Sequence, residues 1–426
     1  HPYIRRRNGQ EPVTYLHPLL KNSLAKTLGV PLFQEQLMQM AIDIANFTPS
    51  EADQLRQAMG SKRSVERMER LRRRLYEGMA ANGITGEVAD EIYTKLVAFA
   101  NYGFPESHSV SFAYLVYASC WLKYHYPAAF CAGLLRSQPM GFYSPHTLVQ
   151  DARRHGVTVL SPDVNASAWQ ATLERCESSR DGIAVRLGFA SVRHVGDDLA
   201  QDLDAARPYV SIEDVARRGT SAKGGMKRNV MESLATAGAF QCFRNDPVAA
   251  GRPARGRRED LWAAGAAAMS SPGRLDGTVV GIEAPQLPGM SDREEALADL
   301  WATGISADGH PTRFIRAALD ARGVLCAAAL KVAESDHNVR VAGIVTHRQR
   351  PATAQGTMFF NLEDETGLIN IVVSAGCWQR YRQIARQAPA LLVTGRLERA
   401  EGVTNVLAHR LETLPMQTLM RSRDFR

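Results

Sequence analysis

The sequence lacks closely spaced cysteine pairs, long apolar runs and a leader pattern at its N-terminus. Its six cysteines are scattered along 426 residues, with no histidines at the spacing of a zinc site. This distribution predicts reduced thiols and a cytoplasmic setting. No apolar run approaches the roughly 20 residues of a membrane-spanning helix, so we expect no membrane association.

A pair of metal-binding carboxylates on a strand is also missing. Two-metal phosphoryl transfer needs such a pair to hold the ions. The candidates fall on expected turns and helix starts: Asp163, Asp197, Asp198 and Asp364. We therefore expect neither a catalytic residue nor a metal ligand in this chain.

Composition favours a folded protein with a negatively charged partner. Hydrophobic residues make up 45% of the chain, enough for the packed cores of the two to four domains that this length predicts. The 51 lysines and arginines exceed the 44 acidic residues, which gives a net charge of +7. An excess of this size favours a polyanion without requiring one.

Helical spacing dominates the N-terminal part of the sequence. Between residues 32 and 130 the apolar residues recur every three or four positions, as at Leu37, Met40 and Ile44. The turn from Tyr102 to Ser109 then opens another helix. Its hydroxyl and imidazole groups, together with unpaired backbone N–H groups, predict an anion site. The alternative is that its aromatic residues are core residues and its histidine a helix cap.

The middle of the chain carries two copies of a helix-hairpin-helix pattern. The first runs from Ser191 to Ala200 around Gly196, and a weaker copy runs from Val230 to Phe240. Backbone N–H groups at such hairpins can bind a phosphate backbone without reading its sequence. Two aspartates directly follow Gly196, so the alternative that this glycine only joins two helices stays open.

The period changes to two from Val339 onward. Five short strands are expected, with a helical stretch between the third and the fourth: 339–345, 357–362, 369–373, 391–396 and 403–407. This arrangement predicts an OB-fold barrel. Phe359 and Phe360 fall on opposite faces of a strand, so at least one of them belongs to the core.

Four motifs resemble, in their order, the fingers of the bacterial DNA polymerase III alpha subunit. They are Phe33-Gln-Glu-Gln-Leu-Met38, Leu55-Arg-Gln-Ala-Met-Gly-Ser-Lys62, Tyr102-Gly-Phe-Pro-Glu-Ser-His-Ser109 and the segment from Trp121 to Phe130. The Pro105-Glu106 pair and the closing Ser422-Arg-Asp-Phe-Arg426 look more like the damage-inducible, error-prone branch of that family. In the family, a segment like His1-Pro-Tyr-Ile lies well inside the protein, so the resemblance implies a C-terminal portion.

The resemblance and the sequence patterns together imply a multidomain fold, with α-helical fingers and a tandem helix-hairpin-helix followed by an all-β OB-fold barrel. The expected parts are fingers at 1–150, a connector at 151–185, the helix-hairpin-helix region at 186–245, a linker at 246–337, the barrel at 338–415 and a tail at 416–426.

The resemblance also implies the roles of particular residues. For binding an incoming nucleotide they are Arg56, Tyr102 and His108, and the basic side chain of Lys62 is expected to join them. For binding DNA, the resemblance and the barrel's composition together give Arg63, His194, Gly196, Lys227, Arg228, Arg348, Arg350 and Phe359. Gln57 stands where the replicase has a second arginine, and this difference lowers the expected affinity for a triphosphate.

The implied function is that of part of an error-prone DNA polymerase acting in translesion synthesis and damage-induced mutagenesis. Its partners would be template-primer DNA, deoxynucleoside triphosphates and a Y-family-like accessory protein, with Mg²⁺ held by aspartates outside this chain. The segment from Gln286 to Met290 looks like a degenerate clamp-binding peptide, which implies only indirect contact with a sliding clamp. The alternative is a stand-alone adaptor that binds single-stranded nucleic acid without catalysis.

Overall fold

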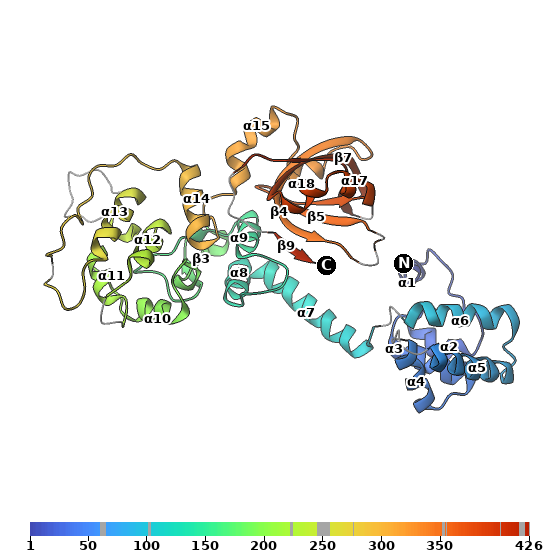
Figure 1. Cartoon of the computed structure of the whole chain (residues 1–426). Helices are drawn as coiled ribbons and strands as arrows, with labels where there is room; N and C mark the ends of the chain where they lie inside the picture. Colours follow the sequence, from blue (N-terminus) through green and yellow to red (C-terminus); the bar gives the residue numbers. More distant parts are fainter. Residues whose placement is uncertain are drawn as a thin grey trace. The chain divides into compact units, whose positions relative to one another are not determined.

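The chain folds into two compact units, His1–Trp121 and Leu122–Arg426 (Figure 1). The computed structural model describes residues 1–59, 65–100, 104–221, 225–244, 256–275, 277–351, 354, 356–400, 402–416 and 422–425. Helix α7 (Glu106–His125) runs through the boundary between the units. No described helix combines the length and the apolar character that crossing a bilayer would require.

The first unit is helical, as its spacing predicts. Its other helices are α1 (Pro2–Arg7), α2 (Leu20–Leu24), η1 (Ala25–Thr27), α3 (Gln34–Ala45), α4 (Pro49–Met59), α5 (Val65–Ala81) and α6 (Gly86–Ala100). Leu37, Met40 and Ile44 line the buried face of α3 and pack into one core with residues of α4, α5 and α6. Helix α4 begins with a reciprocal cap, because Thr48 Oγ1 accepts from the N–H of Glu51 while Glu51 accepts from the N–H of Thr48.

The second unit begins with two helices packed on a small sheet. Helices α8 (Pro127–Arg136) and α9 (Pro145–Arg154) share a core with β1 (Val159–Leu160) and β3 (Ile183–Arg186), and β2 (Thr172–Arg175) completes the sheet in the order β1-β3-β2. The fingers boundary expected at residue 150 therefore differs from the structure, which divides after Trp121. The reason is that the apolar faces of α8 and α9 are buried against this sheet.

The helix-hairpin-helix region has a core that reaches well into the expected linker. The short η2 (Arg180–Gly182) connects β2 to β3 of the small sheet. The helices of the helix-hairpin-helix region are η3 (Phe189–Ser191), α10 (Asp197–Ala205), α11 (Ile212–Arg218), α12 (Arg228–Thr236), η4 (Gln241–Phe243), α13 (Arg257–Ala267) and α14 (Asp292–Thr303). Three alanines of α13, namely Ala263, Ala264 and Ala267, are fully buried in the same core as Phe240. Helix α13, which falls within the linker expected at 246–337, is thus a packed part of this region.

Three short elements join this region to the barrel: η6 (Pro311–Ile315), α15 (Arg316–Asp320) and α16 (Ala327–Leu330). The barrel strands are β4 (Asn338–Gln349), β5 (Met358–Asp364), β6 (Gly367–Val373), β7 (Ala390–Ala400) and β8 (Val403–Thr413). They pair in the order β5-β6-β8-β7-β4, and β4 also pairs with β5, which closes the sheet. Helices α17 (Ala375–Arg380) and α18 (Arg382–Gln387) lie between the third and fourth barrel strands, so the predicted OB-fold is confirmed.

Two details of the barrel depend on single positions. At the register shift between β7 and β8, a Cβ on Gly395 would lie 2.3 Å from the carbonyl oxygen of Leu407, so only glycine allows this close approach. The expected C-terminal tail contributes a strand, β9 (Arg423–Phe425), which pairs in parallel with the end of β4. The predicted split of Phe359 and Phe360 is also confirmed, because Phe360 is fully buried and Phe359 is exposed.

Candidate nucleic-acid interface

Arg56, expected to contact a nucleotide, lies on α4 and pairs with a neighbouring carboxylate. Its Nε and Nη2 donate to Asp53 Oδ1 at 2.9 and 2.8 Å. Gln57 donates to the other oxygen of the same carboxylate at 2.6 Å. Both side chains of the ion pair are more than one third exposed. Such a pair is weak, so the Arg56 guanidinium remains able to exchange Asp53 for a phosphate. Lys62, Arg63 and Tyr102 lie outside the described residues.

His108 lies in the first turn of α7 within an aromatic group. Its ring centroid is 4.8 Å from that of Phe104 and 4.4 Å from that of Phe112. The backbone N–H of Glu106, at the start of the helix, donates to Glu35 at 3.0 Å. One donor of the anion site expected here is therefore occupied by a carboxylate of the chain itself. A nucleotide phosphate would have to use the other N–H groups of this turn or displace Glu35.

The two hairpins differ in charge where a phosphate would approach. Helix α10 begins after Gly196 with two exposed aspartates in its first turn, which disfavours an anion there. Helix α12 begins after Lys227 with Arg228 and has no acidic residue in its first turn. Lys227 and Arg228 are both exposed, and Arg228 pairs with Glu232 one turn along the helix at 2.7 Å. The N-terminus of α12 is thus the better of the two for binding a DNA backbone.

His194 and the neighbouring Arg193 have contacts that tie the first hairpin to α12 and α14. The backbone of His194 is in the left-handed region (φ 65°), and its Nδ1 lies 3.0 Å from the hydroxyl oxygen of Ser233. The neighbouring Arg193 stacks over the Trp301 ring at 4.8 Å. These contacts fix the shape of the hairpin and leave the His194 residue exposed.

Arg348 is buried and serves the barrel itself. Its guanidinium donates to the carbonyl of Ala385 at 2.8 Å and also binds Ala388 and Ser422. Only 6% of the residue is exposed, and burial, opposed by Asp424, lowers its pKa. Sequence reasoning expected Arg348 to contact DNA. The structure corrects this to a structural role, because the β4 strand turns the side chain inward under α18 and β9.

A polar and aromatic surface covers the outer face of β5 and β6. Phe359 is 36% exposed there, and Asn361 and Asn370 stand opposite each other with an amide hydrogen bond of 2.8 Å. Leu368 extends this surface, and the exposed Arg350 follows the end of β4. The second and third strands are the face on which OB-folds bind oligonucleotides, and an exposed aromatic ring with nearby amides and an arginine suits stacked single-stranded bases.

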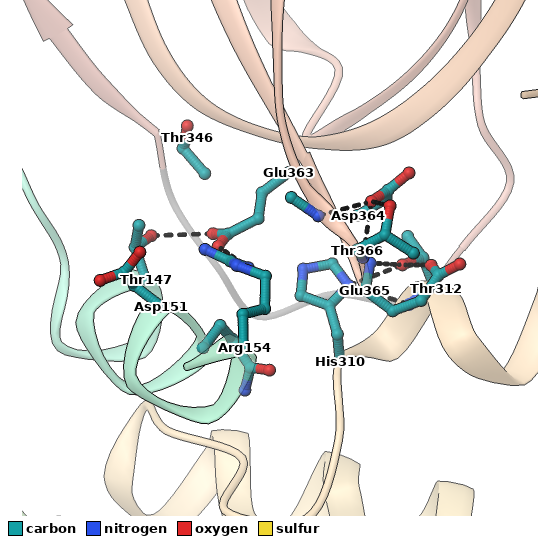
Figure 2. Close-up of polar contacts among 12 residues, drawn as sticks. Thr147, Asp151, Arg154, His310, Thr312, Thr346, Glu363, Asp364, Glu365 and Thr366 are labelled. Carbon is teal, nitrogen blue, oxygen red and sulfur yellow. Dashed lines mark hydrogen bonds and ion pairs between the residues drawn. The ribbon is translucent and has the colours of Figure 1, made fainter. Parts of the chain in front are cut away.

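A buried polar junction fastens the barrel to α9 (Figure 2). Glu363, in β5, is fully buried and accepts from Thr147 Oγ1 at 2.9 Å and from Arg154 Nη1 at 3.1 Å. Burial raises the pKa of Glu363, while Arg154 and Thr147 act against that rise. The Glu363 carboxylate is thus held by its two partners on α9.

The two carboxylates that follow are held in the same way. Asp364 accepts from the backbone N–H of Ala327 at 2.8 Å, and burial raises its pKa. Glu365 accepts from Thr312 Oγ1 at 2.6 Å and from Arg316. Burial alone would raise the pKa of Glu365, but the hydrogen bonds from Arg316 and Thr312 lower it. Three consecutive carboxylates thus serve as anchors of the barrel.

Metal-binding side chains do not cluster in the described parts of the chain. Within the described parts of the chain, no three His, Cys, Asp or Glu side chains gather closely enough to hold an ion. The described residues therefore do not form a site for a catalytic pair of Mg²⁺ ions.

Sequence reasoning missed Asn361, Asn370 and the junction around Glu363. The two asparagines alternate with apolar residues on expected strands, so their common face could have been read from the predicted pairing. The partners of Glu363 lie more than 200 residues away in the sequence, and no local pattern indicates such a contact.

Comparison with known families gives three matches in the order of the fold. The bacterial DNA polymerase III alpha subunit finger domain matches residues 1–83, a helix-hairpin-helix motif matches 156–249 and an OB-fold nucleic acid binding domain matches 339–414.

Similar proteins match over the whole chain. Proteins named error-prone DNA polymerase are 60% identical in Nocardia farcinica, 55% in Mycobacterium tuberculosis and 51% in Corynebacterium glutamicum. Each match covers 100% of this chain, which spans only 37 to 38% of the length of these relatives. Among solved structures, asparaginyl-tRNA synthetase from Pyrococcus horikoshii is 22% identical over 20% of this chain and 21% of its own, with a TM-score of 0.18.

Proposed function

Because this chain belongs to the error-prone branch of the bacterial DNA polymerase III alpha-subunit family, we propose that it is the part of a DNA-directed DNA polymerase that holds the incoming nucleotide and the template-primer DNA. The observation that carries this proposal is the 60% identity over the whole chain, with fingers, hairpins and barrel matched in order. The whole protein would work in the cytoplasm in translesion synthesis and damage-induced mutagenesis.

Single-stranded template would bind the outer face of β5 and β6. Phe359 would stack on a base there, and Arg350 would neutralise a phosphate. Support comes from the exposure of both residues and from the amides of Asn361 and Asn370 beside the ring. Each stacked base contributes about 1–3 kcal/mol in proteins that bind single strands.

Duplex DNA would bind the N-terminus of α12. Lys227 and Arg228 would neutralise the phosphate backbone without reading sequence, next to the unpaired N–H groups of the first turn. The absence of acidic residues from this turn supports the assignment. The acidic start of α10 would keep the backbone away from Gly196 itself.

The deoxynucleoside triphosphate would be held in the first unit by Arg56, Lys62, Tyr102 and His108. Phosphoryl transfer depends mainly on positioning and charge neutralisation, which such side chains on helices can supply. The exchangeable pair between Arg56 and Asp53 supports this role. Mg²⁺ would be bound by carboxylates outside this chain, which alone would bind DNA without extending a primer.

The partners would include a Y-family-like accessory protein, with a sliding clamp reached only indirectly. The segment from Gln286 to Met290 is attached to α13, because Leu287 N–H donates to Glu259 at 3.0 Å and the carbonyl of Pro288 accepts from Arg258 at 3.2 Å. These contacts support the view that this segment is not a free clamp-binding peptide.

Helix α7 supports the view that the chain works as part of a larger enzyme. None of its twenty residues is buried, and its exposed side chains include large apolar ones: Phe112, Tyr114, Leu115, Tyr117 and Trp121. Apolar surfaces of this kind usually contact another protein segment. We propose that the rest of the polymerase covers it.

The test uses the intact protein. Its reading frame should encode, upstream of His1, a domain with paired aspartates, and substituting them should abolish primer extension while DNA binding by this chain persists. A reading frame without such a pair would refute the polymerase proposal. Primer extension by the present chain alone would refute the division of labour.

A further inference from the structure

A basic cleft of about 480 Å³ opens in the second unit, away from the proposed DNA surfaces. It lies between the end of α9, strand β1 and the segment from Asp308 to Arg313. Glu365 reaches it just beyond the end of β5, so the cleft is roughly 20 Å along the strand from Phe359. Its volume is that of a small-ligand site.

Two of the charged residues at the cleft are already neutralised. Arg154 is paired with the buried Glu363 at 3.1 Å. Glu365 accepts hydrogen bonds from Arg316 and Thr312. Neither Arg154 nor Glu365 therefore adds to the net charge that a ligand would meet.

The remaining charges leave one positive charge uncompensated. Arg153 and Arg313 both line the cleft, and among the described lining residues only the acidic Asp308 is left to oppose them. Among the described residues, the half-buried Arg153 guanidinium has neither a hydrogen-bond nor an ion-pair partner. Burial lowers the pKa of Arg153, Asp308 raises it and the charge of Arg313 lowers it further. A partly desolvated, unpaired guanidinium next to a second one favours an anion between them.

His310 forms a buried wall at the same place. It lines the cleft and is 2% exposed. Its Nδ1 contacts Thr312, at 2.6 Å from the hydroxyl oxygen and 3.3 Å from the backbone nitrogen, and its Nε2 is buried. The donors offered to a ligand in the cleft are thus the two guanidinium groups of Arg153 and Arg313.

We propose that this cleft binds a phosphate group through Arg153 and Arg313. A phosphate carries several acceptor oxygens and no obligatory donor, and one negative charge would neutralise the cleft. The group could come from a DNA backbone that leaves the barrel face or from free phosphate. The first source rests on the proposed DNA-binding function, and the second does not.

The experiment uses the whole chain and two probes. Binding of inorganic phosphate is followed by ³¹P NMR, and binding of a single-stranded oligonucleotide by fluorescence anisotropy over a range of salt concentrations. The variants are Arg153→Gln and Arg313→Gln, the second at an exposed position that should not disturb folding. Arg175→Gln on β2 is the matched control, because Arg175 is an exposed arginine of the same unit that does not line the cleft.

Both cleft variants should weaken phosphate binding roughly tenfold, and the control should leave it unchanged. If the DNA backbone is the source, each variant also makes the fall of log affinity with log salt concentration less steep, by about 0.7 in slope. The oligonucleotide then displaces the phosphate. Phosphate binding that depends on Arg153 without any change of slope assigns the cleft to free phosphate.

The proposal is overturned if the chain does not bind phosphate. It is also overturned if Arg153→Gln and Arg313→Gln weaken phosphate binding no more than Arg175→Gln does. A chain that fails to bind the oligonucleotide at all refutes the proposed DNA-binding function instead, and the phosphate titration still decides the cleft. If the thermal unfolding temperature of the Arg313→Gln variant equals that of the unaltered chain, its loss of binding is not caused by unfolding.

Discussion

Two buried histidines make the second unit sensitive to acid. His146 and His310 are 1% and 2% exposed, and their rings lie 5.5 Å apart. Burial, with the nearby Arg154 and Arg153, lowers the pKa of His146 to about 3, and burial lowers the pKa of His310 in the same direction. The folded state therefore needs both rings neutral, while the unfolded chain binds protons near pH 6.5.

The sign and size of the effect follow from linkage. Below pH 6.5 the unfolded state binds more protons than the folded state, so the free energy of unfolding falls as the pH falls, until the folded pKa is reached. For His146 alone the loss is about 1.4 kcal/mol at pH 5.5 and about 2 kcal/mol at pH 5. His310 adds a loss in the same direction.

The assay is urea unfolding of the chain at a series of pH values between 5 and 7.5. His146→Gln removes one of the two groups, so the slope of stability against pH between 5 and 6.5 should become clearly shallower. His337→Gln is the control, since His337 is exposed, and it should leave the slope unchanged. An unchanged slope in the His146 variant would refute the view that its burial sets the acid sensitivity.

Three further predictions concern separate sites. Phe359→Ala should weaken single-strand binding by about 1–3 kcal/mol in a fluorescence titration without altering stability, whereas Phe360→Ala should cost about 3–5 kcal/mol of unfolding free energy; equal effects on binding would contradict the assignment of the outer face. Replacing both Lys227 and Arg228 by Gln should make the fall of log duplex affinity with log salt concentration less steep, by up to about 1.8 in slope, and leave single-strand binding unchanged. Weakened single-strand binding with unchanged duplex binding would exclude α12 as the duplex site. Arg257→Ala should lower the free energy of unfolding by about 3–5 kcal/mol, because it leaves the buried Asp299 without its ion-pair partner at 2.6 Å. Thermal unfolding would measure the loss, and a loss below about 1 kcal/mol would contradict the pairing.

Periodicity and spacing predicted much of the fold. The change from helical spacing to alternation near Val339 located the barrel, and the spacing of Leu37, Met40 and Ile44 located the core face of α3. The boundary between the two units could not be predicted from the sequence. Helices α8 and α9 look like a continuation of the preceding helices in the sequence, and only tertiary packing assigns them to the second unit.

The candidate sites were predicted more unevenly. Phe359 and Lys227 lie exposed, as binding residues should. Arg348 and Arg350 look alike in the sequence, yet one is buried in the barrel and the other is exposed, because the end of β4 is covered by β9 from the far end of the chain. Long-range contacts of this kind have no local sequence signal.

The most direct test of the central claim is photo-crosslinking of the whole chain to a template-primer with a single-stranded overhang. Reactive bases would be placed in the overhang or in the duplex, and the attached peptides identified by mass spectrometry. The account predicts that overhang bases attach to β5 and β6 around Phe359 and that duplex positions attach near the start of α12. Overhang crosslinks concentrated on α12, or none on the barrel, would contradict it.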